Sequence, residues 1–407
     1  MGLFWGVHIS TECIRVALAV AAPTLMQIYH ISPKIMGYVL SGWNWGYTAS
    51  LLFAGLLVDR FGPWIVMGAG WGVWSLATLV LPLASGAASI FSLRALFGAG
   101  NSIRLPSQAA SLSRWFRPEE RATGVGVSFA GNQVGPAIGT TIAASILVFL
   151  GWKAVFYWIG GASLLLSLLW IAFYPDKKVG RSASSRGSDP MPAARVPLLA
   201  LLRHRSVWGI IFTQIGYLYA YFFFLTWLPG YLILERKMTV LKTGFVASLP
   251  FWVGMIGTLA GGWLGDYLIR RGFSRTASRK WIIGSGFTLS TILVVTAAFT
   301  YQTWLAVTLL TLCMGCMRLA TASIHATPLD LAPPGAVASL ASIQNFAGSL
   351  SALMGTIVTG YIVEATGSFV AALVAAGGMA LFGAISYVFV VGRLETLPIA
   401  PAHPAAA

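Results

Sequence analysis

A long series of apolar stretches, each about 20 residues in length, runs through this 407-residue chain. A helix needs about 20 mainly apolar residues to cross the hydrocarbon core of a bilayer. Runs such as residues 162–173 do not alternate apolar and polar side chains, so they indicate helices and not the strands of a membrane barrel. Only 9% of the residues are charged, against about 25% in soluble proteins, which excludes a water-facing surface. We therefore predict an all-α membrane protein surrounded by a lipid bilayer.

Twelve transmembrane helices are predicted. They cover residues 3–28, 35–58, 64–84, 88–111, 122–149, 154–174, 206–234, 243–265, 281–300, 303–328, 336–362 and 368–392. The opening segment lacks a basic region and carries Glu12 and Arg15 in its middle, so it is expected to be the first spanning helix and not a cleaved signal.

The basic residues lie mainly in one set of loops. Loops after even-numbered helices, together with the C-terminal tail, contain 17 Lys and Arg, whereas loops after odd-numbered helices contain 5. Cytoplasmic loops carry such an excess, so both termini are predicted to be cytoplasmic, in a bacterial inner membrane. The same distribution argues against nucleic acid as a partner of this chain of net charge +15. A monomer is expected.

The two halves of the chain resemble each other. Gly55 and Asp59 recur as Gly262 and Asp266 at the end of an even-numbered helix, with the same offset of 207. The segment 175–205 is rich in Ser, Pro and basic residues, which is typical of a flexible linker. We expect two pseudo-symmetric six-helix bundles, residues 1–174 and 206–392, followed by a tail at 393–407.

The loop after the second helix carries a recognisable motif. Gly55, Asp59, Arg60, Phe61 and Gly62 resemble the signature loop of the major facilitator superfamily. Glycine permits a tight turn and close approach of helices. In that family the loop latches the cytoplasmic gate, and the resemblance implies the same for Gly55, Asp59, Arg60, Gly62 and, in the second half, Asp266.

A closer resemblance is to the anion:cation symporter family, which includes galactonate, hexuronate and vesicular glutamate transporters. The matching stretches are 36–41, 93–98, 114–122, 151–157 and 225–231. The resemblance implies the major facilitator fold, a site near the bilayer midplane and transport by alternating access. Ile14 and Asn101 stand where many members carry the Asp and Glu that accept protons, so proton coupling by that pair is not expected here.

Four arginines lie inside the predicted helices. They are Arg15, Arg94, Arg104 and Arg318, and the one acid within the predicted boundaries is Glu12. A charge at this depth costs roughly 2.5–3.5 kcal/mol on insertion scales, so such residues face a cavity or a partner. An excess of guanidinium groups favours a carboxylate or phosphate ligand.

Arg15 and Arg94 match the family pattern and are the predicted contacts for a substrate carboxylate. Arg318 is a candidate anchor from the second half, whereas Arg104 could extend toward the cytoplasmic surface. The alternative for Arg15 and Arg94 is pairing with backbone carbonyls or with Glu12.

Uncharged residues are expected to complete the substrate site. The candidates are Tyr47, Asn101, Asn132, Gln133, Tyr221 and Asn345. Tyr47 matches a family tyrosine, and Asn101 shares a helix face with Arg94. Each polar side chain is equally suited to bridging two helices, and Tyr221 to packing.

Glu12 is the first candidate for proton coupling. An anion that occupies Arg15 would remove the partner of the Glu12 carboxylate and make protonation easier. His325 is a second candidate and His8 a further one. A purely structural Glu12–Arg15 pair is the alternative.

The favoured function is secondary active transport of a small organic anion, with proton-coupled uptake. An uncoupled facilitator or anion exchanger is the alternative within transport, and a non-transporting anion sensor is the alternative outside it. No nucleotide loop, metal cluster or nucleophile triad appears in the sequence, so neither an enzyme nor a cofactor or metal is expected. Sugar acids, aromatic acids and dicarboxylates all satisfy two or three arginines.

Overall fold

The computed structural model describes residues 2–115, 121–173, 198–333 and 336–398, and within these ranges the chain is helical without a strand. Helices cover all twelve predicted segments. In order they are α1 (Gly2–Ile28), α2 (Pro33–Phe61), α3 (Pro63–Val80) with η1 (Leu81–Leu83), α4 (Ala87–Asn101), α5 (Arg104–Trp115), α6 (Arg121–Leu150), α7 (Trp152–Phe173), α8 (Leu198–Leu202), α9 (Arg205–Thr226), α10 (Leu228–Leu234), α11 (Val240–Val246), α12 (Leu249–Arg270), α13 (Arg275–Phe299), α14 (Thr303–Leu331), α15 (Val337–Thr366), α16 (Val370–Ile385) and η2 (Ser386–Val390).

Three predicted spans are divided into two helices each. The breaks fall at residues 102–103 between α4 and α5, at Trp227 between α9 and α10, and at residues 247–248 between α11 and α12. Most of the predicted linker and most of the tail lie outside the described residues. The predicted flexibility of the linker therefore stays a prediction. The division into two six-helix bundles stays a prediction.

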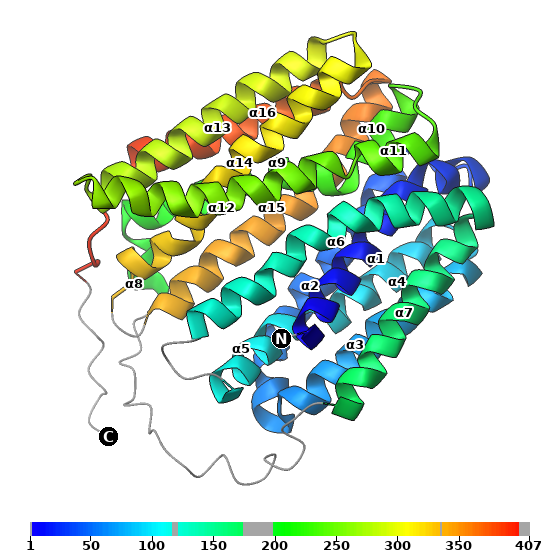
Figure 1. The fold of residues 1–407 in the computed structure, drawn as a ribbon, viewed down its shortest axis with the longest axis horizontal. Helices are drawn as coiled ribbons and strands as arrows, with labels where there is room; N and C mark the ends of the chain where they lie inside the picture. The colour runs from blue at the N-terminus through cyan, green and yellow to red at the C-terminus, as the bar shows by residue number, and fades with distance from the viewer. Residues whose placement is uncertain (1, 116–120, 174–197, 334–335, 399–407) are drawn as a thin grey trace. The chain divides into compact units, whose positions relative to one another are not determined.

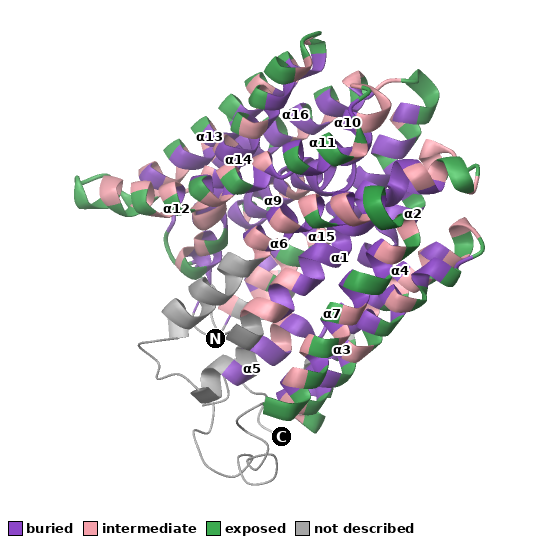
Figure 2. Ribbon diagram, turned by 45° about the vertical axis from the view of Figure 1, so that its right-hand side comes forward, coloured by how far each residue is buried: buried purple, intermediate pink, exposed green. Residues whose placement is uncertain are grey.

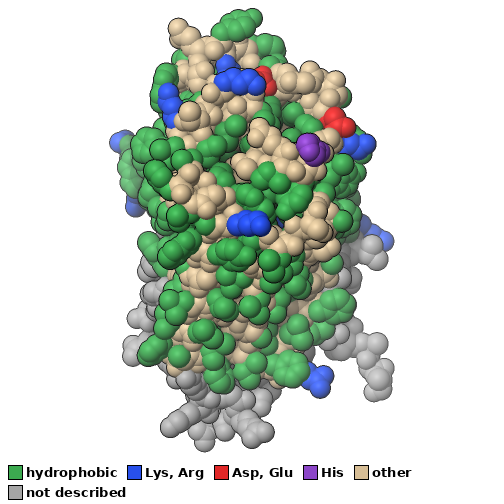
Figure 3. All heavy atoms as spheres, turned by 90° about the vertical axis from the view of Figure 1, so that its right-hand side faces the viewer, with side chains coloured by type: hydrophobic (Ala, Val, Ile, Leu, Met, Phe, Trp, Pro, Cys, Tyr) green, Lys and Arg blue, Asp and Glu red, His purple; other side chains and the backbone are tan. Residues whose placement is uncertain are grey.

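Ten described helical segments are long and apolar enough to cross a bilayer. Large apolar side chains are exposed on them, for example Phe149 at 74% and Phe173 at 70%. On the face drawn in Figure 3, hydrophobic side chains prevail and charged ones are few. A surface of this kind suits contact with lipid and not with water.

The chain forms two compact units. Unit 1 comprises Met1–Ala183, Phe222–Trp252 and Leu353–Ala372, and unit 2 comprises Ser184–Tyr221, Val253–Ala352 and Leu373–Ala407. In unit 1, α1 packs on α6 and α7, α2 on α4, and α3 on α4 and α7 (Figure 1). Figure 2 shows α1 buried along most of its length, as expected for a helix enclosed by others.

Glycines set the distance between α2 and α4 in unit 1. A Cβ atom at Gly46 would lie 1.8 Å from the carbonyl oxygen of Ala95, and one at Gly98 would lie 2.0 Å from that of Trp43. Any larger residue would push the two helices apart, so backbone contact depends on these positions. This contact brings Arg94 of α4 next to Gly42 of α2, where a Cβ atom would lie 2.9 Å from the Cβ atom of Arg94.

Unit 1 also joins α2 to the last part of α15. The Lys34 backbone N–H donates to Glu364 Oε2 at 2.9 Å, and the hydroxyl groups of Tyr38 and Tyr361 are 3.2 Å apart. At Gly360 a Cβ atom would lie 2.5 Å from the Pro33 carbonyl oxygen. Helices from distant parts of the sequence therefore meet in direct backbone contact at this end of the unit.

In unit 2, α13 packs on α14, and glycines of α12 contact α14. Cβ atoms at Gly257 and Gly261 would lie 2.3 and 2.0 Å from the carbonyl oxygens of Gly315 and Leu319. Arg279 of α13 and Asp330 of α14 form an ion pair at 2.7 Å. These contacts fix α14, which carries Arg318.

Candidate functional site

Buried charge in the described part of the chain is mainly positive. Glu12 is the one acidic side chain among its buried residues, whereas four arginines are buried: Arg15, Arg94, Arg104 and Arg318. The first three belong to unit 1 and the fourth to unit 2. Both units therefore hold cationic groups away from bulk water, where an anion is the favourable ligand.

Arg15 is paired with Glu12 on α1. Its Nη1 donates to the two carboxylate oxygens at 2.9 and 3.0 Å. The guanidinium lies 4.0 Å from the ring centroid of Trp43 and 5.0 Å from that of Phe222, as in cation–π contacts. Its Nη2 is buried without a hydrogen-bond partner. An acid and two rings thus orient Arg15, and one nitrogen is left to bind a ligand.

Arg94 has no acidic partner among the described residues. The side chain is 3% exposed, and its Nε and Nη1 atoms are buried without hydrogen-bond partners. A cavity of about 10 Å³ adjoins it, lined also by Ile14, Thr78 and Phe156. That volume holds at most one water molecule. Arg94 is consequently a desolvated cation whose donors are available to an anion.

Tyr47 and Asn101 lie in the same unit as these arginines. The ring of Tyr47 stacks on Trp43 with centroids 4.8 Å apart. Asn101 is fully buried, and its Nδ2 donates to Thr11 Oγ1 at 3.3 Å while its Oδ1 has no partner. The amide thus bridges α4 and α1 and keeps one free acceptor.

A polar network surrounds His8 on α1. Arg104 Nη1 lies 2.6 Å from His8 Nδ1 and donates to Asn132 Oδ1 at 2.9 Å. Asn132 Oδ1 is itself 2.7 Å from His8 Nδ1, and Gln108 Oε1 is 3.0 Å from His8 Nε2. Arg104 is 7% exposed, so it does not extend to the surface. Gln133, next to Asn132 on α6, is buried as well.

The arginine of unit 2 lies among tyrosines. Arg318 Nη1 donates to the hydroxyl group of Tyr217, and its guanidinium lies 4.5 Å from the ring centroid of Tyr221. Tyr217 also contacts Thr321 Oγ1 at 3.3 Å and stacks between Tyr221 and Phe287. The hydroxyl group of Tyr217 and the ring of Tyr221 therefore help to orient Arg318.

His325 and Asn345 are exposed residues of unit 2. His325 lies within electrostatic range of Arg318. His325, the second candidate for proton coupling, therefore lies near enough to Arg318 to be affected by its charge, and Asn345 is accessible.

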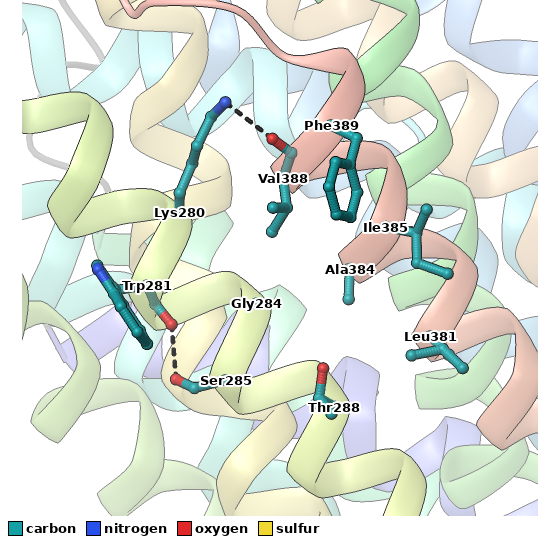
Figure 4. Close-up of a pocket in the computed structure, with 10 residues that line it drawn as sticks. All are labelled: Lys280, Trp281, Gly284, Ser285, Thr288, Leu381, Ala384, Ile385, Val388 and Phe389. Carbon is teal, nitrogen blue, oxygen red and sulfur yellow. Dashed lines mark hydrogen bonds between the residues drawn. The ribbon is translucent and has the colours of Figure 1, made fainter.

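A groove of about 510 Å³ lies between α13 and α16 of unit 2 (Figure 4). Its walls are mainly apolar, and Lys280 Nζ donates to the Val388 carbonyl oxygen at 2.8 Å. Trp281 and Phe389 at its edges are 67% and 75% exposed. None of the predicted site residues lines it, and its apolar walls do not suit an organic anion.

Comparison with known proteins decides the family. The model of the Major Facilitator Superfamily matches residues 4–278. The chain belongs to this superfamily. It is 32% identical to the D-galactonate transporter of Escherichia coli O6:H1 over 94% of this chain and 92% of that protein. It is 30% identical to the hexuronate transporter of Bacillus subtilis over 92% of this chain and 90% of that protein.

Solved structures support the same fold. A bacterial homolog of the human lysosomal transporter Spinster, in an inward-facing and unoccupied conformation, aligns with a TM-score of 0.76 at 15% identity, covering 96% of this chain and 93% of that one. The predicted all-α membrane fold of the major facilitator superfamily is confirmed. Because the superfamily consists of transporters, the chain is a transporter and not an enzyme.

The signature loop of the superfamily is partly described. Gly62 ends α2 with a φ of +81°, a conformation that favours glycine, and Pro63 begins α3. Arg60 is exposed and lies 5.3 Å from the Phe61 ring centroid. The side chain of Asp59 and position 55 lie outside the described set. Asp266 is exposed at the end of α12. Their role in gating stays a prediction.

Sequence reasoning missed three partners of the predicted site. Trp43, Gln108 and Tyr217 carry no charge that would single them out, and their contacts with Arg15, His8 and Arg318 join residues far apart in the sequence or on different helices. The spacing of His8, Glu12 and Arg15 by four and three residues did indicate one shared face of α1.

Proposed function

We propose that the chain is a secondary active transporter that takes up a sugar acid or a related organic carboxylate by alternating access, together with a proton. One observation carries the proposal: Arg15, Arg94 and Arg104 are buried in unit 1, and each has at least one guanidinium nitrogen without a partner. Leaving such donors unbound costs about 1–3 kcal/mol or more each, which a bound anion would offset.

The chemistry of the relatives' substrates supports this substrate class. Transporters named for D-galactonate, hexuronate and galactarate or D-glucarate are 28–32% identical to the chain over most of its length. Such acids combine a carboxylate with several hydroxyl groups. Arginines bind a carboxylate in a bidentate manner. The hydroxyl groups suit amide side chains, for which the candidates are Asn101, Asn132, Gln133 and Asn345.

We further propose that the protein works as a monomer in a bacterial inner membrane with both termini in the cytoplasm. The charge bias of the loops supports this orientation. The contact of α2 with the end of α15 in unit 1 supports a gate that closes on the outer side. Gly55, Asp59, Arg60, Gly62 and Asp266 are the proposed counterparts on the cytoplasmic side.

The test uses purified protein in proteoliposomes loaded with D-galactonate or D-glucuronate. Counterflow of labelled substrate is measured for the parent protein, for Arg15→Gln and for Arg94→Gln. Each variant is expected to weaken apparent affinity by about 10- to 100-fold, because a hydrogen bond to a charged group contributes about 1.5–3 kcal/mol.

Lys153→Gln is the matched control, since Lys153 is an exposed residue of α7 and the change removes the same charge. It is expected to transport like the parent. Equal apparent affinities for all variants would place the anion elsewhere. Binding of the acid by parent protein that shows no counterflow would favour the non-transporting sensor.

An exchanger or uncoupled facilitator is the second candidate. Asn101 supports it, because this buried amide hydrogen-bonds Thr11 at a position where the related symporters carry a protonatable acid. If the parent protein shows counterflow but a pH gradient does not change accumulation, the uncoupled mechanism is favoured.

A further inference from the structure

The atoms around His8 present an unusual hydrogen-bond problem. Arg104 Nη1, Asn132 Oδ1 and His8 Nδ1 form a triangle with sides of 2.6, 2.7 and 2.9 Å. A guanidinium nitrogen can only donate, and an amide oxygen can only accept. The Arg104 contact therefore forces the Asn132 amide to present its oxygen, and the protonation of His8 decides the other two sides.

Neither protonation state of His8 satisfies the whole triangle. If Nδ1 carries no proton, it accepts from Arg104 but meets the Asn132 oxygen as a second acceptor at 2.7 Å. If Nδ1 carries a proton, it donates to Asn132 but faces a second donor on Arg104, and once Nε2 is protonated as well the imidazolium also opposes the like charge of Arg104. The state that prevails therefore depends on where the Arg104 guanidinium lies.

The two amide contacts of His8 fit a charged imidazolium. Both ring nitrogens of His8 then donate to amide oxygens, Nδ1 to Asn132 and Nε2 to Gln108 at 3.0 Å. His8 is fully buried, so this pair of acceptors replaces water. Burial and the contact with Arg104 both oppose the second proton, and of the two only the contact with Arg104 can be changed by a ligand.

Arg104 is in turn available to a ligand. Its Nε atom is buried without a hydrogen-bond partner. The charged and titratable groups that act on it are Glu12 and Arg15 of α1 and Tyr47 of α2, whereas the contacts of His8 with α6 come from the uncharged Asn132. An anion that binds Arg104 would neutralise the charge that opposes protonation of His8.

We propose that His8 is the proton-binding site of this transporter, and that anion binding to Arg104 promotes protonation of His8 at Nδ1. This inference rests on the proposed function and refines its proton coupling, for which the sequence offered Glu12, His325 and His8 as candidates without choosing among them. By linkage, protonation of His8 must strengthen anion binding by the same factor. A monovalent anion and one proton then cross together without net charge.

The first experiment separates substrate movement from coupling. Proteoliposomes containing the parent protein, His8→Gln or Glu12→Gln are given labelled D-galactonate, once for counterflow and once with an acid exterior. One proton per anion allows about tenfold accumulation for each unit of pH gradient, since 1.4 kcal/mol corresponds to a factor of ten. We expect that accumulation in the parent and in Lys153→Gln, and near-complete loss of it in His8→Gln. Glu12→Gln removes the partner of Arg15 and is expected to change the apparent affinity for D-galactonate, but its accumulation should still depend on the pH gradient.

A second variant guards against a folding defect in His8→Gln. Gln108→Met keeps a side chain of similar length and removes the oxygen that accepts from His8 Nε2. It is expected to reduce accumulation several-fold while showing measurable counterflow. A fluorescent pH indicator with the purified parent protein is expected to report uptake of about one proton for each D-galactonate bound.

The outcomes distinguish the two proposals. Absence of counterflow by the parent with any sugar acid would refute the proposed function itself. Counterflow with undiminished pH-driven accumulation in His8→Gln or in Gln108→Met would overturn the role of His8 and leave the transport function intact. Accumulation lost in Glu12→Gln and kept in His8→Gln would assign the proton to Glu12 instead.

Discussion

One hydroxyl group positions the arginine of unit 2. Tyr217 accepts from Arg318 through its hydroxyl oxygen, while its ring stacks on Tyr221 and Phe287. Tyr217→Phe keeps the ring and removes the hydroxyl. We expect an increase of about 10- to 100-fold in the KM for the sugar acid and a lower melting temperature, because a buried hydrogen bond to a charged group contributes about 1.5–3 kcal/mol.

Tyr219→Phe is the control, because Tyr219 lies on the same helix and makes no hydrogen bond through its hydroxyl within the described residues. Transport assays and thermal unfolding of the two variants provide the measurement. A KM for Tyr217→Phe that matches the control would mean that Arg318 does not take part in substrate binding.

The identity of the charged residues could be read from the sequence, but their partners could not. The excess of four arginines over one acid inside the helices is visible in the sequence, and all five side chains are buried in the structure. Arg104 was expected to reach the surface, yet it lies in the network of His8. The sequence predicted one helix here, whereas the structure has a break at residues 102–103, so Arg94 lies on α4 and Arg104 begins α5.

Helix positions were more predictable than helix continuity. Runs of about 20 apolar residues set where a helix crosses the bilayer, so α1, α6, α7 and α14 begin and end within a few residues of the prediction. The breaks at Trp227 and at residues 247–248 fall just before Pro229 and Pro250, which stand in the first turns of α10 and α12. Because Pro23 and Pro136 lie inside the unbroken helices α1 and α6, a proline in an apolar run does not by itself predict a break.

Close contact between α2 and α15 depends most on Gly360. A Cβ atom at Gly360 would lie 2.5 Å from the Pro33 backbone oxygen, so Gly360→Leu must separate the two helices. Overpacking costs about 1–3 kcal/mol, which shifts a two-state equilibrium by about 5- to 150-fold. If this contact closes a gate, the counterflow rate of Gly360→Leu should fall at least fivefold.

Gly161→Leu tests whether the loss is specific to the contact. Nothing lies within 4 Å of a Cβ atom at Gly161, which is also in a helix of unit 1. Both changes alter helix propensity alike, so their comparison isolates the contact with α2. Equal counterflow rates in the two variants would exclude a gating role for the α2–α15 contact.

At the scale of the whole molecule, the distribution of charge predicts the orientation in the membrane, and α13 offers the sharpest test. Five basic residues precede or begin this helix between residues 266 and 280, whereas residues 300–303 at its other end carry none. Twenty-five helical residues extend about 37 Å, enough to cross the bilayer.

The orientation of α13 can be tested with single thiols at its two ends. In a protein in which Ala replaces Cys13, Cys313 and Cys316, the changes Tyr301→Cys and Arg271→Cys each place one thiol at an exposed position. A membrane-impermeant maleimide added to intact cells should label the thiol at 301 and spare the one at 271 until the membrane is permeabilised. Labelling in the opposite order would reverse the proposed orientation and, with it, the side on which α2 and α15 meet.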